Sequence, residues 1–459
     1  MTPPLASALP PEADSLRKTL GGWQVLFYGL GSMLGAGIYA LIGRAAGMLG
    51  NAVWLAFLAA MVVALLTGLS YACLGSRHAR AGGAAYITQR AFGRPRLSYV
   101  VGLAVMMSGL TSMATGSQAI AENLLRVLGP VLPVKALAIG LVLLLGGVIY
   151  RGIRESMWAN LVCTFVETAG LLFIIAVGAR HWGSVNYLEM PGASAADFSG
   201  VTLGLVLQGA VLTFFSFIGF EDILNVSEEV KRPRRDIPFG LVGAMVAATL
   251  IYLGIAVTAV SVMPWQDLAR STAPLMDVAR IAAPWFRGIN GLYLGITVFA
   301  IGNTVLLNFL MGSRLLYGMS RQGLLPAALA RIHPVRRTPH VAIAVLFGIV
   351  VVLILSGGIR PLAEATVLLL LGVFTVVNLA LVRLQGRAGE PRGEFEVPRW
   401  VPLLGAIVCA ILIMVRAQSA WANPANRVAP LIAVAIVAIS LGLHAWLKPG
   451  VVAPKPGAG

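Results

Sequence analysis

The chain has 459 residues, of which 58% are hydrophobic and only 11% are charged, and its mean hydropathy is +0.85. A soluble protein of this length carries about 25% charged residues, so this composition excludes an ordinary soluble globular protein and indicates an integral membrane protein. The formal net charge of +16 does not indicate nucleic-acid binding, because the basic residues gather between apolar segments on one side of the predicted membrane topology.

Apolar segments of about 20 residues, the length that crosses a bilayer as a helix, recur along the whole chain. We predict an all-α polytopic protein with one transmembrane domain over residues 21–447, a polar tail over 1–20 that is not a signal peptide, and a second tail over 448–459. The twelve predicted spans cover residues 23–47, 52–76, 98–123, 134–150, 156–178, 202–226, 237–263, 287–313, 340–357, 362–382, 400–418 and 428–447.

The basic residues predict the orientation of these spans. With the N-terminus in the cytoplasm, the cytoplasmic segments hold 24 of the 34 lysines and arginines, including clusters at 77–96, 231–235 and 321–337. Positive residues favour the cytoplasmic side. We therefore predict a multi-pass protein of the cytoplasmic (inner) membrane with both termini in the cytoplasm, embedded in the lipid bilayer and without a nucleic-acid partner.

The first span contains the sequence GSMLGAGIY, with glycines at 31, 35 and 37. Glycine inside a helix costs about 1 kcal/mol relative to alanine, so this density has a reason. Gly31 and Gly35 form a GxxxG pair that would pack closely against another helix. Alternatively the helix breaks here and exposes free N–H and C=O groups. The N–H end suits a carboxylate and the C=O end an ammonium group, so a zwitterionic amino acid would use both.

Glu167 lies midway along the fifth predicted span. A charged side chain at this depth costs about 2.5–3.5 kcal/mol on insertion scales. Glu167 is therefore either a protonated or hydrogen-bonded structural residue, or the site of a proton or a cation. The sequence pattern leaves both interpretations open.

The sixth span contains FFSFIGFED, residues 214–222, in which Gly219 and two acids interrupt the apolar run. It follows the first interrupted span by five spans. Paired broken spans in corresponding halves indicate inverted repeats with a binding site at their midplane interface. The predicted repeats cover about 21–180 and about 200–385, and two additional helices cover about 398–447.

Asn303 and Thr304, midway along the eighth span, would either form interhelical hydrogen bonds or face a cavity. The three cysteines lie within spans without metal-ligand spacing, and the five histidines lie in loops or at span ends. No catalytic Ser–His pair and no phosphate-binding loop stands out. We therefore predict that the protein is not an enzyme and has no cofactor and no metal site.

Four segments resemble motifs of the amino acid–polyamine–organocation transporters, in particular bacterial amino acid permeases. They are GSMLGAGIY in the first span, FFSFIGFEDILNVSEEVKRPRRDIP over 214–238, RLLYGMSRQGLLP over 314–326 and VPRWVPLLG over 397–405. The resemblance implies a LeuT-like five-plus-five inverted-repeat fold with two extra helices. It also implies a substrate site where the interrupted first and sixth helices meet.

The resemblance assigns roles to backbone groups at the two interruptions. The N–H groups implied to receive a substrate carboxylate are those of Gly35, Ala36 and Gly37. The carbonyl groups implied to receive the α-amine are those around Met33, Phe215, Ser216 and Ile218. The residues implied to shape the pocket are Phe217 and Gly219.

Two positions depart from the family pattern. Glu167 stands where some proton-coupled relatives have a lysine, and a carboxylate cannot replace a bound cation as a lysine amine can. Glu221, which could help to hold the break, stands where an aspartate is common. We expect a secondary active transporter of amino acids that works by alternating access, with the proton as coupling ion and Glu167 as coupling residue. The alternatives are an amine or polyamine carrier, which Glu221 and Asp222 would favour, an amino-acid exchanger, and a transporter-like sensor.

Overall fold

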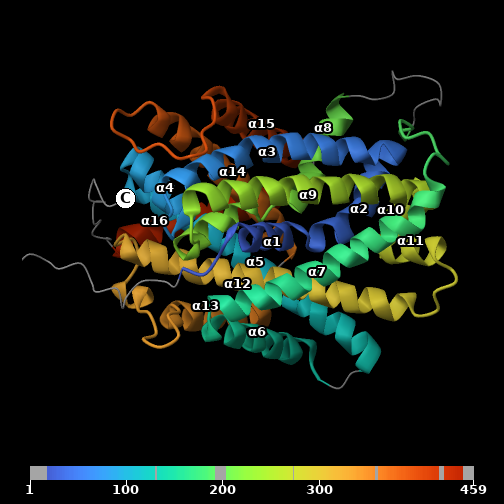
Figure 1. Cartoon of the computed structure of the whole chain (residues 1–459), viewed down its shortest axis with the longest axis horizontal. Helices are drawn as coiled ribbons and strands as arrows, with labels where there is room; N and C mark the ends of the chain where they lie inside the picture. Colours follow the sequence, from blue (N-terminus) through green and yellow to red (C-terminus); the bar gives the residue numbers. More distant parts are fainter. Residues whose placement is uncertain are drawn as a thin grey trace, which may run out of the picture.

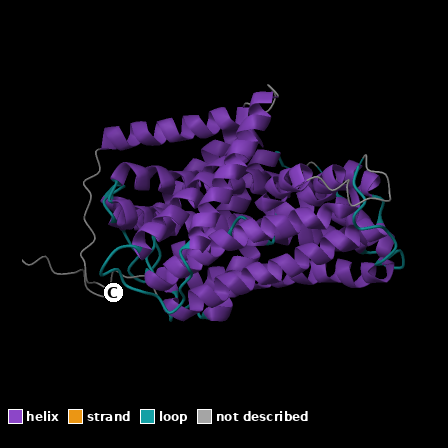
Figure 2. Ribbon diagram, turned by 90° about the horizontal axis from the view of Figure 1, so that it is seen from above, coloured by secondary structure: helices purple, strands orange, loops and turns teal. Residues whose placement is uncertain are grey.

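The computed structural model describes residues 18–129, 132–191, 203–271, 273–356, 360–422 and 428–447. Within these ranges every regular element is a helix, and the only bridge between extended segments pairs Leu20 with Val230. The long helices run side by side along one axis (Figure 1), and the loops gather at the two ends of the bundle (Figure 2). The predicted tails lie outside the described residues, except for 18–20.

Sixteen α-helices and five short 3-10 helices follow one another along the described residues. The α-helices are α1 (Gly22–Met33), α2 (Ala36–Leu49), α3 (Val53–Arg77), α4 (Gly83–Phe92), α5 (Pro95–Leu128), α6 (Val134–Arg151), α7 (Ile153–Gly178), α8 (Leu203–Phe214), α9 (Pro233–Val262), α10 (Trp265–Arg270), α11 (Pro274–Ala282), α12 (Ile289–Arg321), α13 (His340–Ser356), α14 (Arg360–Gln385), α15 (Trp400–Ala422) and α16 (Val428–Leu447). The 3-10 helices are η2 (Gly50–Ala52), η3 (Ala179–His181), η5 (Phe215–Phe217), η6 (Phe220–Glu229) and η7 (Ala327–Ala330).

Each of the twelve predicted spans coincides with one of these helices or with a broken series of them. By length and composition, eight helical segments of the described residues are able to cross a membrane, and three further apolar helices are shorter. The protein is thus helical and rich in membrane-spanning segments, and the count of twelve spans stays a prediction.

The first span is broken, which is one of the two alternatives that the glycine pattern left open. Helix α1 ends at Met33, Gly35 is extended, and α2 begins at Ala36. The sixth span is broken as well, since α8 passes into η5 and then into η6 through Gly219, whose φ of +124° is a conformation that favours glycine. Both interruptions therefore leave the regular α-helical hydrogen-bond ladder.

Close packing, the alternative reason for the glycines, is present too. A Cβ at Gly37 would lie 2.7 Å from the Cα of Ser216, and a Cβ at Gly219 would lie 2.6 Å from the carbonyl oxygen of Ser32. A Cβ at Gly31 would clash with the side chains of α7 and α12. The glycines thus permit the two breaks and also let the two broken helices touch each other.

One end of the bundle is held together by contacts among loops that we predicted to share one side of the membrane. The backbone N–H groups of Thr19 and Leu20 donate to the Glu229 carbonyl oxygen, both at 2.9 Å. The Arg314 guanidinium makes two hydrogen bonds of 3.2 Å to the buried Glu229 carboxylate. Glu228 accepts hydrogen bonds from the Ala81 N–H and from Arg321. At this end the start of α1, the end of η6 and α12 are therefore closed against one another.

Short helices lie between several of the long ones. Helix α4 lies in the segment 77–97, and α10 and α11 lie in 264–286. The segment 320–334 contains the end of α12, which continues to Arg321, and the four-residue η7, and Gly323 turns the chain between them with a φ of +73°.

Candidate functional site between the two helix breaks

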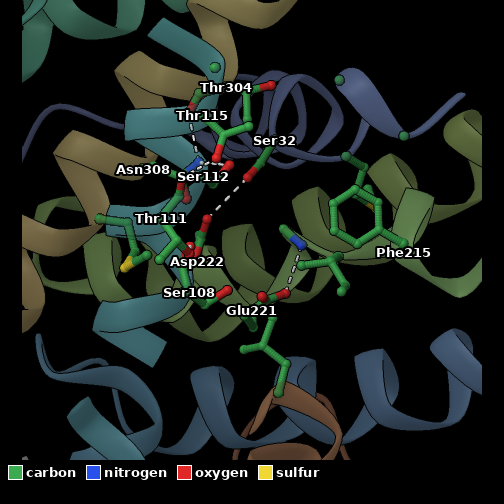
Figure 3. Close-up of a pocket in the computed structure, with 18 of the residues that line it drawn as sticks. Ser32, Ser108, Thr111, Ser112, Thr115, Phe215, Glu221, Asp222, Thr304 and Asn308 are labelled. Atoms are coloured by element: carbon green, nitrogen blue, oxygen red, sulfur yellow. Dashed lines mark hydrogen bonds between the residues drawn. The ribbon is translucent and has the colours of Figure 1, made fainter. Parts of the chain in front are cut away.

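A cavity of about 190 Å³ lies between the two breaks (Figure 3). Its wall combines the α1–α2 break, the η5–η6 break, one face of α5, one face of α12, and Leu370 of α14. Segments that are far apart in the sequence thus line one small cavity. Its position is the one that paired broken helices predict.

The predicted site residues divide into those that line this cavity and those that do not. The lining residues among them are Met33, Gly35, Gly37, Phe215, Ile218, Gly219, Glu221 and Thr304. Ser216 and Phe217 are buried in the same break outside the lining, and the backbone of Ala36 begins α2. Asn303 and Glu167 lie elsewhere in the bundle, as described below.

The first turn of α2 presents backbone N–H groups that have no partner within the helix, as at every helix N-terminus. The Gly35 N–H donates to the Met33 carbonyl oxygen at 2.9 Å, which leaves Ala36 and Gly37 as the N–H groups at the start of this turn. A helix N-terminus of this kind favours an anion. The break can therefore receive a carboxylate through a smaller set of N–H groups than the resemblance implied.

Tyr252 of α9 joins the two breaks. Its hydroxyl lies 2.6 Å from the Met33 carbonyl oxygen and 2.8 Å from the Ser216 carbonyl oxygen. These are two of the carbonyl groups implied to receive a substrate amine. The Met33 oxygen also accepts the Gly35 N–H, whereas the Ser216 oxygen keeps a second lone pair for a ligand. Tyr252 could not be singled out from the sequence, because one tyrosine in an apolar span carries no signal of its own.

The α5 wall of the cavity is a row of hydroxyl side chains. They are Ser108, Thr111, Ser112 and Thr115. Their spacing of three and four residues places them on one helix face. This helical spacing is visible in the sequence and could have indicated a polar face of α5. Opposite them, the Asn308 side chain donates to the Ser112 hydroxyl at 3.2 Å and to the Thr304 carbonyl oxygen at 2.9 Å.

Two neighbouring carboxylates complete the lining. Asp222 accepts a hydrogen bond of 3.1 Å from the Ser32 hydroxyl, and Glu221 accepts one of 2.8 Å from the Gly219 N–H. Both side chains are almost fully buried. Neither belongs to an ion pair with a described residue, and the lining contains no lysine, arginine or histidine. The cavity therefore has an acidic, polar wall beside the exposed backbone of the two breaks.

Asn303 forms interhelical hydrogen bonds and does not line the cavity. Its side-chain nitrogen lies 3.1 Å from the Thr164 hydroxyl and 3.4 Å from the Gly31 carbonyl oxygen. Thr164 in turn donates to the Asn160 side chain at 3.1 Å. This chain of polar contacts connects α1, α7 and α12 at Gly31, which lies shortly before the first break in the sequence.

Glu167 is fully buried on α7, outside the cavity lining. Both of its carboxylate oxygens lack a hydrogen-bond partner among the residues that the structure describes. It lies near Tyr39 of α2 and Tyr252 of α9. It therefore lies beside the helices that form the first break, in a position where it is easier to hold as a neutral acid than as an ion.

Comparison with known proteins agrees with this architecture. The profile of the family described as "Amino acid permease" matches residues 20–441. A branched-chain amino acid permease of Bacillus subtilis is 28% identical, over 87% of this chain and 88% of that protein. A transporter of Mycobacterium tuberculosis is 31% identical, over 91% of this chain and 88% of that protein. The chloroplastic cationic amino acid transporter 9 of Arabidopsis thaliana is 30% identical, over 70% of this chain and 58% of that protein.

Proposed function

Because the chain belongs to the amino acid permease family, whose members are multi-pass membrane transporters and not enzymes, we propose that it is a secondary active transporter of amino acids in the cytoplasmic membrane. The observation that carries this proposal is the cavity between the two helix breaks. It is built from backbone groups of both breaks, so that it offers partners for both ends of a zwitterion.

The substrate carboxylate binds at the first turn of α2, where the N–H groups of Ala36 and Gly37 and the helix dipole favour an anion. The α-amine binds at carbonyl groups of the breaks, among them Ile218. Phe215 and Gly219 shape the pocket between these ends. The direction of the two broken helices thereby sets the orientation of the bound amino acid.

Alternating access is proposed to follow from the five-plus-five repeat, with residues about 21–180 as one half and about 200–385 as the other. The described state supports this mechanism, because the Arg314–Glu229 pair and the backbone contacts of Leu20 close the bundle at one end. In the proposed topology, with both termini in the cytoplasm, this is the cytoplasmic end. Opening it requires the start of α1 and the end of η6 to separate.

Proton coupling is proposed to act through Glu167. Its buried carboxyl group has no hydrogen-bond partner among the described residues, so its ionised form depends on partners that a rearrangement of the first break would provide. A proton bound with different affinity in the two states is what coupling requires. The competing role is a structural one, in which the neutral acid only fills space between α7, α2 and α9.

Uptake into proteoliposomes tests the proposed function. The purified protein should accumulate one or more radiolabelled amino acids in the vesicles, faster when the outside is acidic. A thermal-shift screen of all amino acids and common amines identifies the ligand beforehand, since binding raises apparent stability by mass action. A ligand that stabilises the protein but is never taken up would mark a sensor, and stabilisation by no amino acid would overturn the proposal.

A further inference from the structure

We infer that the substrate carries a second positive charge, an ammonium or guanidinium group at the far end of its side chain, and that Asp222 is the residue that selects it. This inference rests on the proposed function. That function explains the backbone groups of the two breaks, but it gives no role to Asp222 or to the hydroxyl row on α5.

The first observation that supports a cationic substrate is the charge of the cavity wall. Asp222 and Glu221 are adjacent, almost fully buried, and face the cavity without a basic partner among the described residues. Glu221 is occupied locally, since it accepts the Gly219 N–H at 2.8 Å and so holds the second break. Among the described residues, the Asp222 carboxylate accepts one hydrogen bond, from the Ser32 hydroxyl. A buried carboxylate is stable when a cation pairs with it, and a bound ligand is the available source.

The second observation is that hydroxyl groups of the wall present hydrogen-bond acceptors to the cavity. Thr111 donates its proton to carbonyl oxygens of its own helix at 2.9 and 3.0 Å, and Thr115 donates to the Thr111 carbonyl oxygen at 2.9 Å. Thr304 donates likewise to Ala300 at 3.3 Å. A hydroxyl whose proton is used in this way presents only lone pairs to a ligand. The wall around Asp222 is thus rich in acceptors, which suits a group with several N–H donors.

The third observation is the arrangement of these groups, which indicates where the end of the substrate side chain would lie. In Figure 3 the Asp222 carboxylate points toward Ser32 and lies on the same side of the cavity as Ser108 and Thr111, away from Phe215. The carboxylate and α-amine of an amino acid are assigned to the backbone of the breaks, so that the acidic side remains for the end of the side chain. An aliphatic side chain would leave these acceptors without donors, which a buried site tolerates poorly.

Matched ligand pairs test the inference on the purified full-length protein. Lysine is compared with norleucine, which lacks the terminal ammonium, and arginine with citrulline, its neutral analogue. The cationic member of each pair should bind about 100-fold tighter or more, because a site built for hydrogen bonds rejects analogues that leave its groups unpaired. Equal binding within both pairs would overturn the inference and leave amino acid transport intact.

Variants tie this preference to Asp222. Asp222→Asn should lower the lysine preference by about tenfold or more, as expected for loss of a charge-assisted partner. Asp236→Asn, which changes a buried acid of α9 outside the cavity lining, should leave it unchanged. Ser32→Ala, which keeps the charge and removes its hydrogen bond, should weaken the preference less, and it replaces Asp222→Asn if that variant fails to fold.

A further ligand, cadaverine, separates this inference from the proposed function. Cadaverine is lysine without its carboxylate, so it should bind much more weakly than lysine. Cadaverine binding as tightly as lysine, with loss in Asp222→Asn, would support the role of Asp222 and overturn the amino acid assignment. An unchanged lysine preference in Asp222→Asn would overturn the role of Asp222 alone.

Discussion

The Tyr252 hydroxyl lies 2.6 Å from the carbonyl oxygen of Met33, and so connects α9 to the last residue of α1. The same hydroxyl lies 2.8 Å from the Ser216 carbonyl oxygen in the second break. Since a hydroxyl has one proton, the two carbonyl groups share it. Tyr252 thereby fixes the distance between the two breaks whose backbone forms the cavity.

Tyr252→Phe should therefore weaken substrate binding while the protein still inserts into the membrane. Loss of one buried hydrogen bond is worth about 1 kcal/mol, or roughly a fivefold rise in Kd, measured by titration of the purified protein. Tyr293→Phe is the matched control, because its hydroxyl bonds to the Gly170 carbonyl oxygen outside the cavity. An unchanged Kd in Tyr252→Phe would show that the tie does not position the site.

Gly37→Val should weaken substrate binding strongly while the protein still inserts into the membrane. A Cβ at this position would lie 2.7 Å from the Ser216 Cα, so that the two breaks must move apart, and overpacking costs about 1–3 kcal/mol. That corresponds to a loss of affinity of roughly fivefold to a hundredfold. Gly147→Val on α6 is the control, since a Cβ there meets nothing within 4 Å. Normal affinity in a folded Gly37→Val variant would remove this break from the site.

Glu167→Gln should keep substrate binding and lose uptake driven by a pH gradient. The amide has nearly the same shape but binds no proton, so that counterflow exchange, which needs no net proton movement, should continue. Glu155→Gln, at the exposed start of the same helix, is the control. If Glu167→Gln only lowers the melting temperature and keeps pH-driven uptake, Glu167 is structural and the coupling site lies elsewhere.

The burial of His78 beside Arg90 should make the stability of the protein depend on pH. Burial, together with the Arg90 charge, lowers the pKa of His78 from 6.5 to about 4. The Glu390 carboxylate lies 2.8 Å from His78 and 2.6 Å from Arg90. Although burial alone would raise the pKa of Glu390, its hydrogen bond with Arg90 holds that pKa below the usual 4.5.

The direction of this pH dependence follows from the number of protons bound by the folded and the unfolded protein. Between about pH 4 and 6.5 the unfolded chain binds more protons at His78 than the folded protein does, so stability should fall as the pH drops through this interval. Glu390 adds a loss in the same direction at lower pH. The melting temperature measured from pH 8 to pH 4 should decline less in His78→Gln than in the unaltered protein. Parallel curves for the two proteins would contradict this assignment.

Cysteine labelling should establish the orientation. Lys231→Cys and Val335→Cys place thiols at exposed positions of two basic loops, and an impermeant maleimide should reach them only from the cytoplasmic side. Trp182→Cys, exposed between α7 and α8, should react only from outside. Reversed labelling would show that the orientation in the membrane is the opposite of the proposed one. Labelling of all three positions from the same side would contradict the predicted spans.

The helices could be predicted from the amino-acid sequence, together with the places where two of them are interrupted. Hydropathy over about 20 residues is a local property, and in a bilayer an apolar segment has to satisfy its backbone as a helix. Glycine at 35 and at 219 is likewise a local signal, because conformations outside the helix cost it little. For the first span, however, the glycine pattern left a break and close packing as alternatives, and in the structure both occur.

Which side chains complete the cavity depends on the tertiary structure and could not be predicted from the sequence. Ser32 and Asp222 form a hydrogen bond across 190 residues of sequence, and the hydroxyl row of α5 faces them only because α5 packs beside both breaks. Asn303 and Thr304 are neighbours in sequence, yet one bonds to α1 and α7 and the other lines the cavity. A helix turns by about 100° per residue, so whether a polar residue meets a ligand or a neighbouring helix depends on how the helices are rotated against one another.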